Sequence, residues 1–189
     1  SDLGQKSDPS KATRAGAEAD GSDVSLFDVE KALLGGSGDA MKADPMLEHI
    51  RTRVTDEGLI IEVFDTAGSP LFDDDTVKPT PIFGELVAMI GRVLAHTANP
   101  VAITGNLALG DTGRGGPDPW HLSADRAQLA RGRLVEAGVT DDRLARVTGK
   151  ADRSPVTDNP RDSRNRRIEI TLRVTANGGT ADYRIDRWD

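Results

Sequence analysis

"PIFGELVAMIGRVLAHTANPVAIT", residues 81–104, predicts a helix that is followed at once by a buried strand. Apolar side chains recur in its first part at the three- and four-residue spacing of one helical face, namely Ile82, Leu86, Ile90, Val93 and Leu94. Thr80 is expected to be the N-cap and Pro81 the first helical residue, where its missing N–H is harmless. Residues 100–104, PVAIT, are short and apolar, which is typical of a central strand with both faces covered.

Segments upstream and downstream of this stretch have the alternation of β-strands. Residues 49–55, HIRTRVT, alternate apolar and polar side chains, and residues 59–65, LIIEVFD, follow the turn-forming Asp56-Glu57-Gly58. This pattern predicts an antiparallel hairpin. Residues 166–174, RRIEITLRV, show the clearest period of two in the chain and predict the last strand.

A second helix and a further strand are expected between these segments. The helix would run from Ser123, as its N-cap, to about Ala137, and residues 144–149, LARVTG, would form the strand. The order is then strand, strand, helix, strand, helix, strand, long loop, strand. This order predicts an α/β fold of the α+β sandwich type, a mixed sheet with two helices packed on one face. The opposite face is expected to be solvated or covered by a partner.

The chain divides into parts of different composition. We expect a flexible linker at 1–22, short linker helices at 23–48, the folded domain at 49–175 and a C-terminal tail at 176–189. Within the second part, one helix is expected at 24–34 with Ser22 or Asp23 as its N-cap, and another at 39–48. The tail is expected to add a turn and an edge strand, or to fray.

Composition excludes several classes of function. The net charge of −7 and the pI near 5.0 argue against nucleic-acid binding, which needs a basic face. The absence of cysteine excludes disulfides and thiolate sites. No apolar run reaches the roughly 18 residues of a membrane span. Because the sequence begins with serine, we expect a fragment or processed product whose anchor would lie upstream.

No set of residues has the spacing of an enzyme site. The three histidines, His49, His96 and His121, stand in separate segments without metal-ligand spacing, and no nucleophile elbow, Walker loop or dinucleotide fingerprint is present. The acids at 73–75 could hold a cation, but such a run is more typical of a solvated loop. We therefore expect no catalytic residues, no metal and no cofactor.

Arg126 is the first candidate for a binding residue. It is expected in the first turn of the helix that Ser123 caps, where the helix dipole disfavours a cation. That position suggests an anionic partner for its guanidinium. The partner could be a ligand, or an acid of the chain such as Asp111 or Asp125.

Four segments together resemble a known family. They are GLIIEVFDTAGSPLFD, LSADRA after a tryptophan, RVTGKAD, and DNPRDSRNRRIEI. They resemble the periplasmic domains of the MotB family of flagellar stator proteins, within the OmpA-like peptidoglycan-binding superfamily. The resemblance covers roughly residues 40 to 175. It implies a sheet with two helices in the order given above, and non-covalent binding of the peptide stem of peptidoglycan.

The resemblance also implies a set of binding residues. Arg126 would bind a carboxylate of diaminopimelate through two charge-assisted hydrogen bonds. Leu122, at the start of the same motif, would lie in the binding site. Arg166 would support the same pocket; otherwise it is an exposed charge at a strand end, or it pairs with Asp162.

The loop after the central strand departs from the family pattern. Where the family has Gly-His-Thr-Asp, this chain has residues 105–108, Gly-Asn-Leu-Ala, so Asn106 replaces the histidine and Ala108 replaces the acid. Pro119 stands where the family commonly has asparagine. Asp111 could fold back into the place of the missing acid, or the pocket could lack one. The candidate peptidoglycan-binding residues are Asn106, Asp111, Leu122, Arg126 and Arg166.

The partners that the resemblance implies are a second copy of the chain and a MotA-like stator subunit. The latter would be contacted through a membrane segment that lies outside this sequence. A flagellar P-ring protein is a further candidate, and the expected location is the periplasmic domain of an inner-membrane protein. Two other functions remain open: an OmpA-like envelope tether without a motor, and a diverged domain that docks on flagellar ring proteins.

Overall fold

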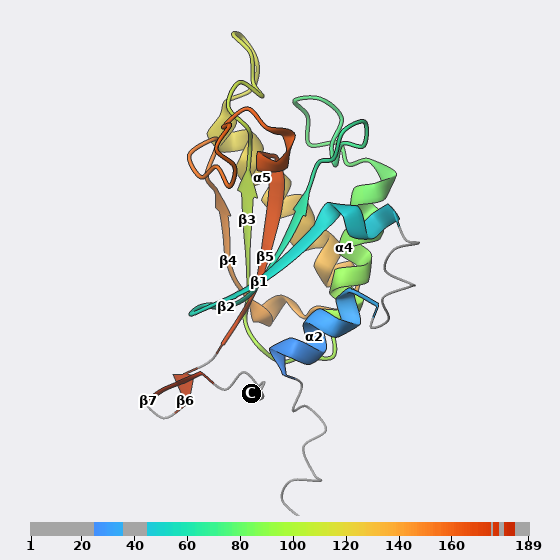
Figure 1. Cartoon of the computed structure of the whole chain (residues 1–189), viewed down its shortest axis with the longest axis vertical. Coiled ribbons are helices and arrows are strands. Elements are labelled where there is room, and N and C mark those ends of the chain that lie inside the picture. Colours follow the sequence, from blue (N-terminus) through green and yellow to red (C-terminus); the bar gives the residue numbers. More distant parts are fainter. Residues whose placement is uncertain (1–24, 36–44, 175, 178–179, 184–189) are drawn as a thin grey trace, which may run out of the picture.

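A computed structural model describes residues 25–35, 45–174, 176–177 and 180–183 (Figure 1). Its main feature is a five-stranded sheet in the order β1-β2-β5-β3-β4. The strands are β1 (Ile50–Thr55), β2 (Gly58–Phe64), β3 (Val101–Asn106), β4 (Leu144–Gly149) and β5 (Arg167–Arg173). β3 and β4 are parallel and the other neighbours are antiparallel, so the predicted mixed sheet is confirmed.

The predicted hairpin is β1 and β2, paired from Ile50 with Val63 to Thr55 with Gly58. Gly58 is the first residue of β2 and has a φ of +137°. A Cβ at this position would lie 2.0 Å from the carbonyl oxygen of Leu172 on β5. Glycine is therefore required here both by the backbone conformation and by the close approach of the neighbouring strand.

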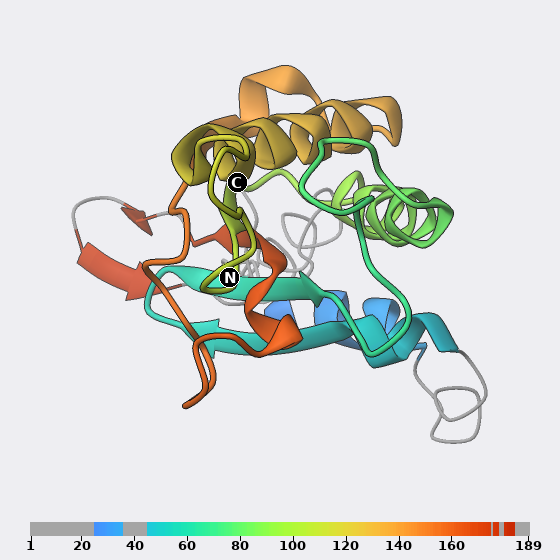
Figure 2. The ribbon, with the colours of Figure 1, turned by 90° about the horizontal axis from the view of Figure 1, so that it is seen from above.

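Three α-helices of the described residues contribute to the core, one more than the two expected on the sheet. α4 (Pro81–Leu94) packs against α5 (Pro119–Glu136), and α5 contacts β3 and β4. α2 (Leu26–Leu33) contacts α4 and β2, and its apolar side chains belong to the same core cluster. Figure 2 shows α4 and α5 together on one side of the sheet. The predicted helix at 24–34 is therefore part of the folded unit.

Two helices begin at residues other than those expected. Ser25 caps α2, and it exchanges side-chain-to-backbone hydrogen bonds with Asp28. Asp118 caps α5, because its Oδ1 accepts a hydrogen bond from the Trp120 amide at 2.8 Å and Pro119 occupies the first helical position. The prediction of Ser123 as N-cap is therefore wrong. The N-cap lies five residues earlier, at Asp118, and Ser123 lies inside the helix.

The apolar core lies between the sheet and the helix layer. Its fully buried side chains include Leu26 and Leu33 of α2, Leu59, Ile61 and Val63 of β2, Leu86, Ile90 and Leu94 of α4, Ile103 of β3, Leu134 of α5, and Ile168, Ile170 and Leu172 of β5. The helical and alternating spacings of the sequence thus correspond to one continuous buried cluster, as expected for a two-layer fold.

Ser123 marks the closest approach of α5 to the sheet. A Cβ at Gly105 of β3 would lie 2.0 Å from the Ser123 carbonyl oxygen, and one at Gly149 of β4 would lie 2.6 Å from its Oγ. The Ser123 hydroxyl accepts a hydrogen bond from the Ala151 amide at 3.0 Å and donates to the Trp120 carbonyl at 3.1 Å. Two glycines and one interior serine therefore set the position of α5.

The face of the sheet away from the helices is charged. Glu62 of β2 and Glu169 of β5 lie directly opposite each other. Arg53 and Arg164 contact Glu62 at 3.2 and 3.1 Å, and Arg167 contacts Glu169 at 2.7 Å. These arginines offset the repulsion that two opposed carboxylates would otherwise cause.

The remaining described segments are short. They are the 3-10 helices η1 (Pro45–His49), η2 (Asp141–Arg143) and η3 (Ser163–Asn165), and the strands β6 (Ala176–Asn177) and β7 (Thr180–Tyr183). β6 and β7 pair with each other in a separate sheet, so within the described tail no edge strand joins the main sheet. The expected helix at 39–48 falls partly outside the described residues, and the expected linker at 1–22 does so entirely. No helix of the described ranges is long and apolar enough to cross a membrane.

Candidate functional site

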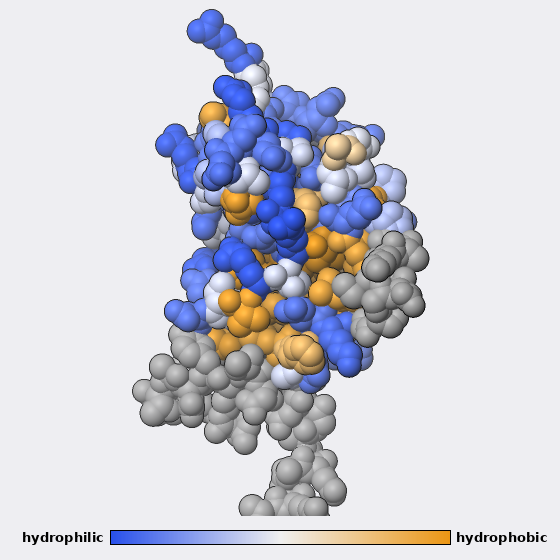
Figure 3. All heavy atoms as spheres, in the orientation of Figure 1, coloured by the Kyte–Doolittle hydropathy of each residue, from blue (hydrophilic) through white to orange (hydrophobic). Residues whose placement is uncertain are grey.

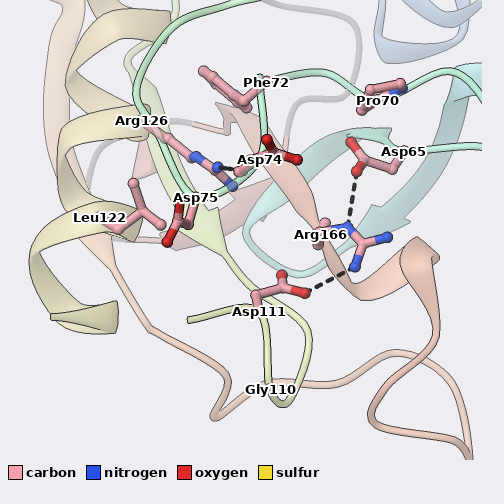
Figure 4. A pocket seen from close by; sticks show the side chains of 10 residues that line it. All are labelled: Asp65, Pro70, Phe72, Asp74, Asp75, Gly110, Asp111, Leu122, Arg126 and Arg166. Atoms are coloured by element: carbon pink, nitrogen blue, oxygen red, sulfur yellow. Dashed lines mark hydrogen bonds and ion pairs between the residues drawn. The ribbon is translucent and has the colours of Figure 1, made fainter. Parts of the chain in front are cut away.

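A pocket of about 400 Å³ opens at the end of the sheet where β2 and β3 finish and β5 begins (Figure 4). The antiparallel pairing of β5 with both strands brings three separate segments to this end, and α5 starts beside them. The pocket is lined by Asp65, Pro70, Phe72, Asp74 and Asp75 after β2, Gly110 and Asp111 after β3, Leu122 and Arg126 of α5, and Arg166 before β5. Figure 3 shows this end of the molecule, at the top, as mostly hydrophilic.

Arg126 is the deeply buried cation of the pocket, with 5% of its surface exposed. Its Nε donates to the Thr76 carbonyl oxygen at 2.9 Å, and its Nη2 donates to the Asp74 carbonyl oxygen at 2.7 Å. The guanidinium carbon lies 4.5 Å from the centre of the Phe72 ring. These partners are neutral. No described carboxylate forms an ion pair with Arg126, and neither of the expected acids, Asp111 and Asp125, bonds to it.

Among the described residues, the acids that compensate the charge of Arg126 therefore act at a distance. Burial lowers its pKa, and the negative charges of Asp65, Asp111 and Asp75 act in the opposite direction. A guanidinium stays protonated in proteins, so the pocket contains a buried positive charge without a contacting anion among the described residues. The expectation that Arg126 lies in the first helical turn is wrong, because α5 begins at Pro119. The helix dipole therefore does not explain why the guanidinium of Arg126 favours an anionic partner. Its burial does, because a buried charge is unfavourable without one.

Arg166 forms the opposite side of the pocket and is bound by two carboxylates. Its Nε contacts Asp65 Oδ2 and its Nη1 contacts Asp111 Oδ1, both at 2.8 Å. Burial lowers the pKa of Arg166, but the hydrogen bonds and charges of Asp111 and Asp65 outweigh this effect and raise it. Asp162, the alternative partner considered for Arg166, instead accepts from the Arg164 amide at the start of η3. Arg166 thus joins the loops that follow β2 and β3.

Asp65 and Asp111 use both of their oxygens within the protein. The second oxygen of Asp65 accepts a hydrogen bond from the Leu71 amide at 2.8 Å, and that of Asp111 accepts from the Ala108 amide at 2.8 Å. Asp111 therefore folds back beside Ala108 and into the pocket. Burial raises the pKa of Asp65, and it outweighs the Leu71 amide and the Arg166 guanidinium, which lower it.

The other two predicted site residues have different positions. Leu122 is 3% exposed and lines the pocket one helical turn before Arg126. Asn106 does not line it. Gly105 lies against α5, so the next side chain points to the opposite face of the sheet, where Asn106 pairs in register with Arg167. Both amide atoms of Asn106 are buried without a hydrogen-bond partner among the described residues.

The loop between β2 and α4 contributes to the pocket, although none of its residues was predicted to be in the site. Asp65, Phe72, Asp74 and Asp75 all line the pocket, although the acids at 73–75 were expected to form a solvated loop. Asp74 is exposed and has a φ of +38°, an uncommon conformation for a residue other than glycine. Its carbonyl is one of the two that Arg126 binds. One feature of the sequence could have pointed to Asp65. It is the last residue of the strand predicted at 59–65, and that strand pairs with the last strand of the sheet. Within the described ranges, no three His, Asp or Glu side chains are placed to hold a metal ion.

Comparisons with known proteins show which proteins this chain resembles. No family model matches the chain. Motility protein B of Escherichia coli strain K12 is 29% identical over 152 residues, which cover 75% of this chain and 48% of that protein. The chain is homologous to Motility protein B and spans about half of its length.

Solved structures share the fold. The cell wall anchor of the T6SS from Pseudomonas aeruginosa superposes with a TM-score of 0.58 and 24% identity, over 76% of this chain and 95% of that one. The periplasmic domain of Helicobacter pylori MotB superposes with a TM-score of 0.56 and 17% identity, over 68% of this chain and 84% of that one. The five-stranded sheet with its helices is therefore the fold of MotB periplasmic domains, as the sequence analysis predicted.

Proposed function

From its homology to Motility protein B, we propose that this chain is the wall-anchoring part of a flagellar stator subunit. It would lie in the periplasm, as a domain of an inner-membrane protein, and bind peptidoglycan non-covalently. Its role is mechanical rather than catalytic, because a stator must be held still against the torque of the rotor. It would act as a homodimer and work with a MotA-like subunit, with a flagellar P-ring protein as a further candidate partner.

The structural observation that supports wall binding is the buried charge of Arg126, which no carboxylate of the described residues contacts. Burying a cation without a contacting anion is unfavourable, and a ligand carboxylate would offset that penalty. The side chain uses Nε and Nη2 for the carbonyls of Thr76 and Asp74, and no hydrogen bond of Nη1 is found within the described residues. We therefore expect a carboxylate of the peptide stem to bind at the Nη1 side of the guanidinium, rather than through the Nε–Nη2 edge.

The other lining residues would support this contact. Leu122 offers an apolar wall beside the guanidinium, and the ion pairs of Arg166 with Asp65 and Asp111 hold the two loops in place. Water is partly excluded from such a pocket, which strengthens the attraction between a guanidinium and a carboxylate.

Co-sedimentation with insoluble peptidoglycan tests the proposal. The full chain should sediment with the wall, and Arg126→Ala should reduce its affinity at least about tenfold, as loss of a hydrogen bond between charged groups predicts. Arg133→Ala is a matched control, because Arg133 lies on the same helix, is half-exposed and pairs with Glu136 outside the pocket. Circular dichroism must show that both variants are folded. Sedimentation of Arg126→Ala equal to that of the parent would contradict the proposal.

A further inference from the structure

Arg161, in the segment between β4 and β5, places an exposed cation at the rim of the pocket. We propose that its guanidinium receives a second carboxylate of the ligand whose first carboxylate is bound by Arg126. The site would thereby select a peptide with both carboxylates free over one in which the second is neutral. This inference rests on the proposed function, which accounts for the first carboxylate alone.

The position of Arg161 follows from its contact with Gly110, which lines the pocket. A Cβ on Gly110 would lie 2.6 Å from Nη1 of Arg161, so the guanidinium rests directly on this glycine. Gly110 has a φ of +86°, a conformation that glycine adopts readily and other residues rarely do. Figure 4 shows Gly110 at the turn of the loop that carries Asp111. The absence of a side chain here therefore lets an arginine of another segment reach the edge of the pocket.

The backbone that carries Arg161 is held in place by hydrogen bonds. The amide of Leu109 donates to the Pro160 carbonyl oxygen at 2.9 Å, which joins the loop after β3 to the segment before β5. The Arg161 amide donates to Oδ1 of Asn159 at 3.1 Å, and the buried Asn165 side chain donates to the Asn159 carbonyl oxygen at 3.0 Å. Less conformational freedom is then lost when a ligand binds to the guanidinium.

The donors of the Arg161 guanidinium are available. No hydrogen bond or ion pair of this side chain is found in the part of the chain that the structure describes. The cations that line the pocket are Arg126 and Arg166, and the first is assigned to the first carboxylate. Arg166 already pairs with Asp65 and Asp111, both at 2.8 Å. Of these three arginines, Arg161 is therefore the one that can bind a second anion without breaking an existing pair.

The ligand class follows from the two arginines. A ligand that reaches both Arg126 and Arg161 must carry two carboxylates separated by several bonds, as the peptide stem of peptidoglycan does. The stem offers two candidates for the second contact, the α-carboxylate of its glutamyl residue and the main-chain carboxylate of its diaminopimelate residue. Because the Arg161 side chain is exposed, water screens this contact, and we expect it to add about two- to fivefold in affinity.

The test is an NMR titration of the full chain with three soluble tripeptides of the stem. One has every carboxylate free, one is amidated at the glutamyl α-carboxylate, and one is amidated at the main-chain carboxylate of diaminopimelate. The parent should bind at least one of the two amides about two- to fivefold more weakly than the free peptide, and that amide identifies the carboxylate. Arg161→Gln should bind this amide and the free peptide equally, whereas Arg161→Lys, which keeps the charge, should retain part of the difference.

Arg153→Gln is the matched control for these variants. Arg153 lies in the same segment and is exposed, but it contacts Asp152 and the Trp120 ring outside the pocket lining. It should discriminate between the peptides as the parent does. The inference is overturned if neither amide weakens binding to the parent, if the difference persists in Arg161→Gln, or if Arg153→Gln abolishes it equally.

The proposed function fails or stands on a different measurement. A chain that sediments with peptidoglycan through Arg126 but binds all three peptides equally would overturn this inference and leave the proposed function standing. A chain that discriminates through Arg161 but does not sediment with the wall would overturn the proposed function alone.

Discussion

Arg126 of α5 donates a hydrogen bond from Nη2 to the carbonyl oxygen of Asp74, a residue 52 positions earlier in the chain, at 2.7 Å. The same guanidinium donates from Nε to Thr76. One side chain therefore holds the loop between β2 and α4 in an uncommon backbone conformation and also lines the pocket. In this arrangement, the residue that would bind the ligand also shapes the wall against which the ligand would lie.

This double role predicts that Arg126→Lys will not behave as a conservative change. A lysine keeps the charge, but its single nitrogen cannot span two carbonyls as the planar guanidinium does. We expect the free energy of unfolding to fall by about 1–3 kcal/mol, and the amide of Thr76 to exchange faster. Urea unfolding and hydrogen exchange followed by NMR would measure both effects. Unchanged exchange at Thr76 would show that the loop does not depend on the guanidinium.

The raised pKa of Asp65 predicts a pH dependence of stability. Burial raises this pKa above the ordinary value of 3.8. At a pH between the ordinary value of 3.8 and the raised pKa, Asp65 keeps its proton in the folded domain but has released it in the unfolded chain. The contribution of Asp65 to the free energy of unfolding should therefore decrease as the pH rises through that window, and then stay level.

The measurement is the free energy of unfolding against pH for the parent and for Asp65→Asn. The amide cannot titrate, so the parent value minus the variant value isolates the Asp65 proton. That difference should decrease with rising pH. A difference that increases would mean that Arg166 and the Leu71 amide outweigh burial, and that the pKa is lowered.

Arg143 is predicted to stabilise the end of α4. Its guanidinium donates to the carbonyl oxygens of Leu94 and Asn99 at 2.8 and 3.0 Å and to the Thr97 hydroxyl at 2.7 Å. Leu94 is the last residue of α4 and the other two residues follow it, at the helix end where carbonyls lack helical partners. Arg143→Ala should lower the free energy of unfolding by about 2–3 kcal/mol. The exposed Arg146 of β4 offers a control, and an equal loss on Arg146→Ala would refute the capping role.

Two glycine substitutions should change stability in opposite directions. Gly105→Ala would place a methyl group 2.0 Å from the Ser123 carbonyl oxygen and push α5 away from β3, with an expected loss of about 1–3 kcal/mol or more. Gly132 lies within α5, and no neighbouring side chain or strand of the described residues comes within 4 Å of where its Cβ would be. Gly132→Ala should therefore add about 0.5–1 kcal/mol. Thermal unfolding of both variants decides the matter, and destabilisation by Gly132→Ala would contradict the account of open space there.

Much of the fold can be predicted from the sequence because its signals are local. The spacing of Leu86, Ile90 and Leu94 defines the buried face of α4, and the alternation in 166–174 defines β5. The order of elements then leaves few possible topologies. The start of α5 could not be decided in this way, since Asp118 and Ser123 are both good capping residues. The tertiary structure decided it, because the hydroxyl of Ser123 is needed by Ala151.

The candidate site, too, could be predicted from the sequence only in part. The family resemblance of the sequence motifs made Arg126, Asp111, Leu122 and Arg166 candidates, and the structure brings these four into one pocket. Asn106 lies on the other face of the sheet, because successive side chains of a strand point in opposite directions.

Only the tertiary structure decided which charged groups pair with each other. Arg166 pairs with Asp65 and Asp111 rather than with Asp162, and Arg126 binds two carbonyls of a loop about fifty residues away. No local spacing encodes these pairs, because they depend on how three loops close over one end of the sheet. Electrostatic partners are chosen by distance and burial in space, whereas helices and strands are chosen by patterns along the chain.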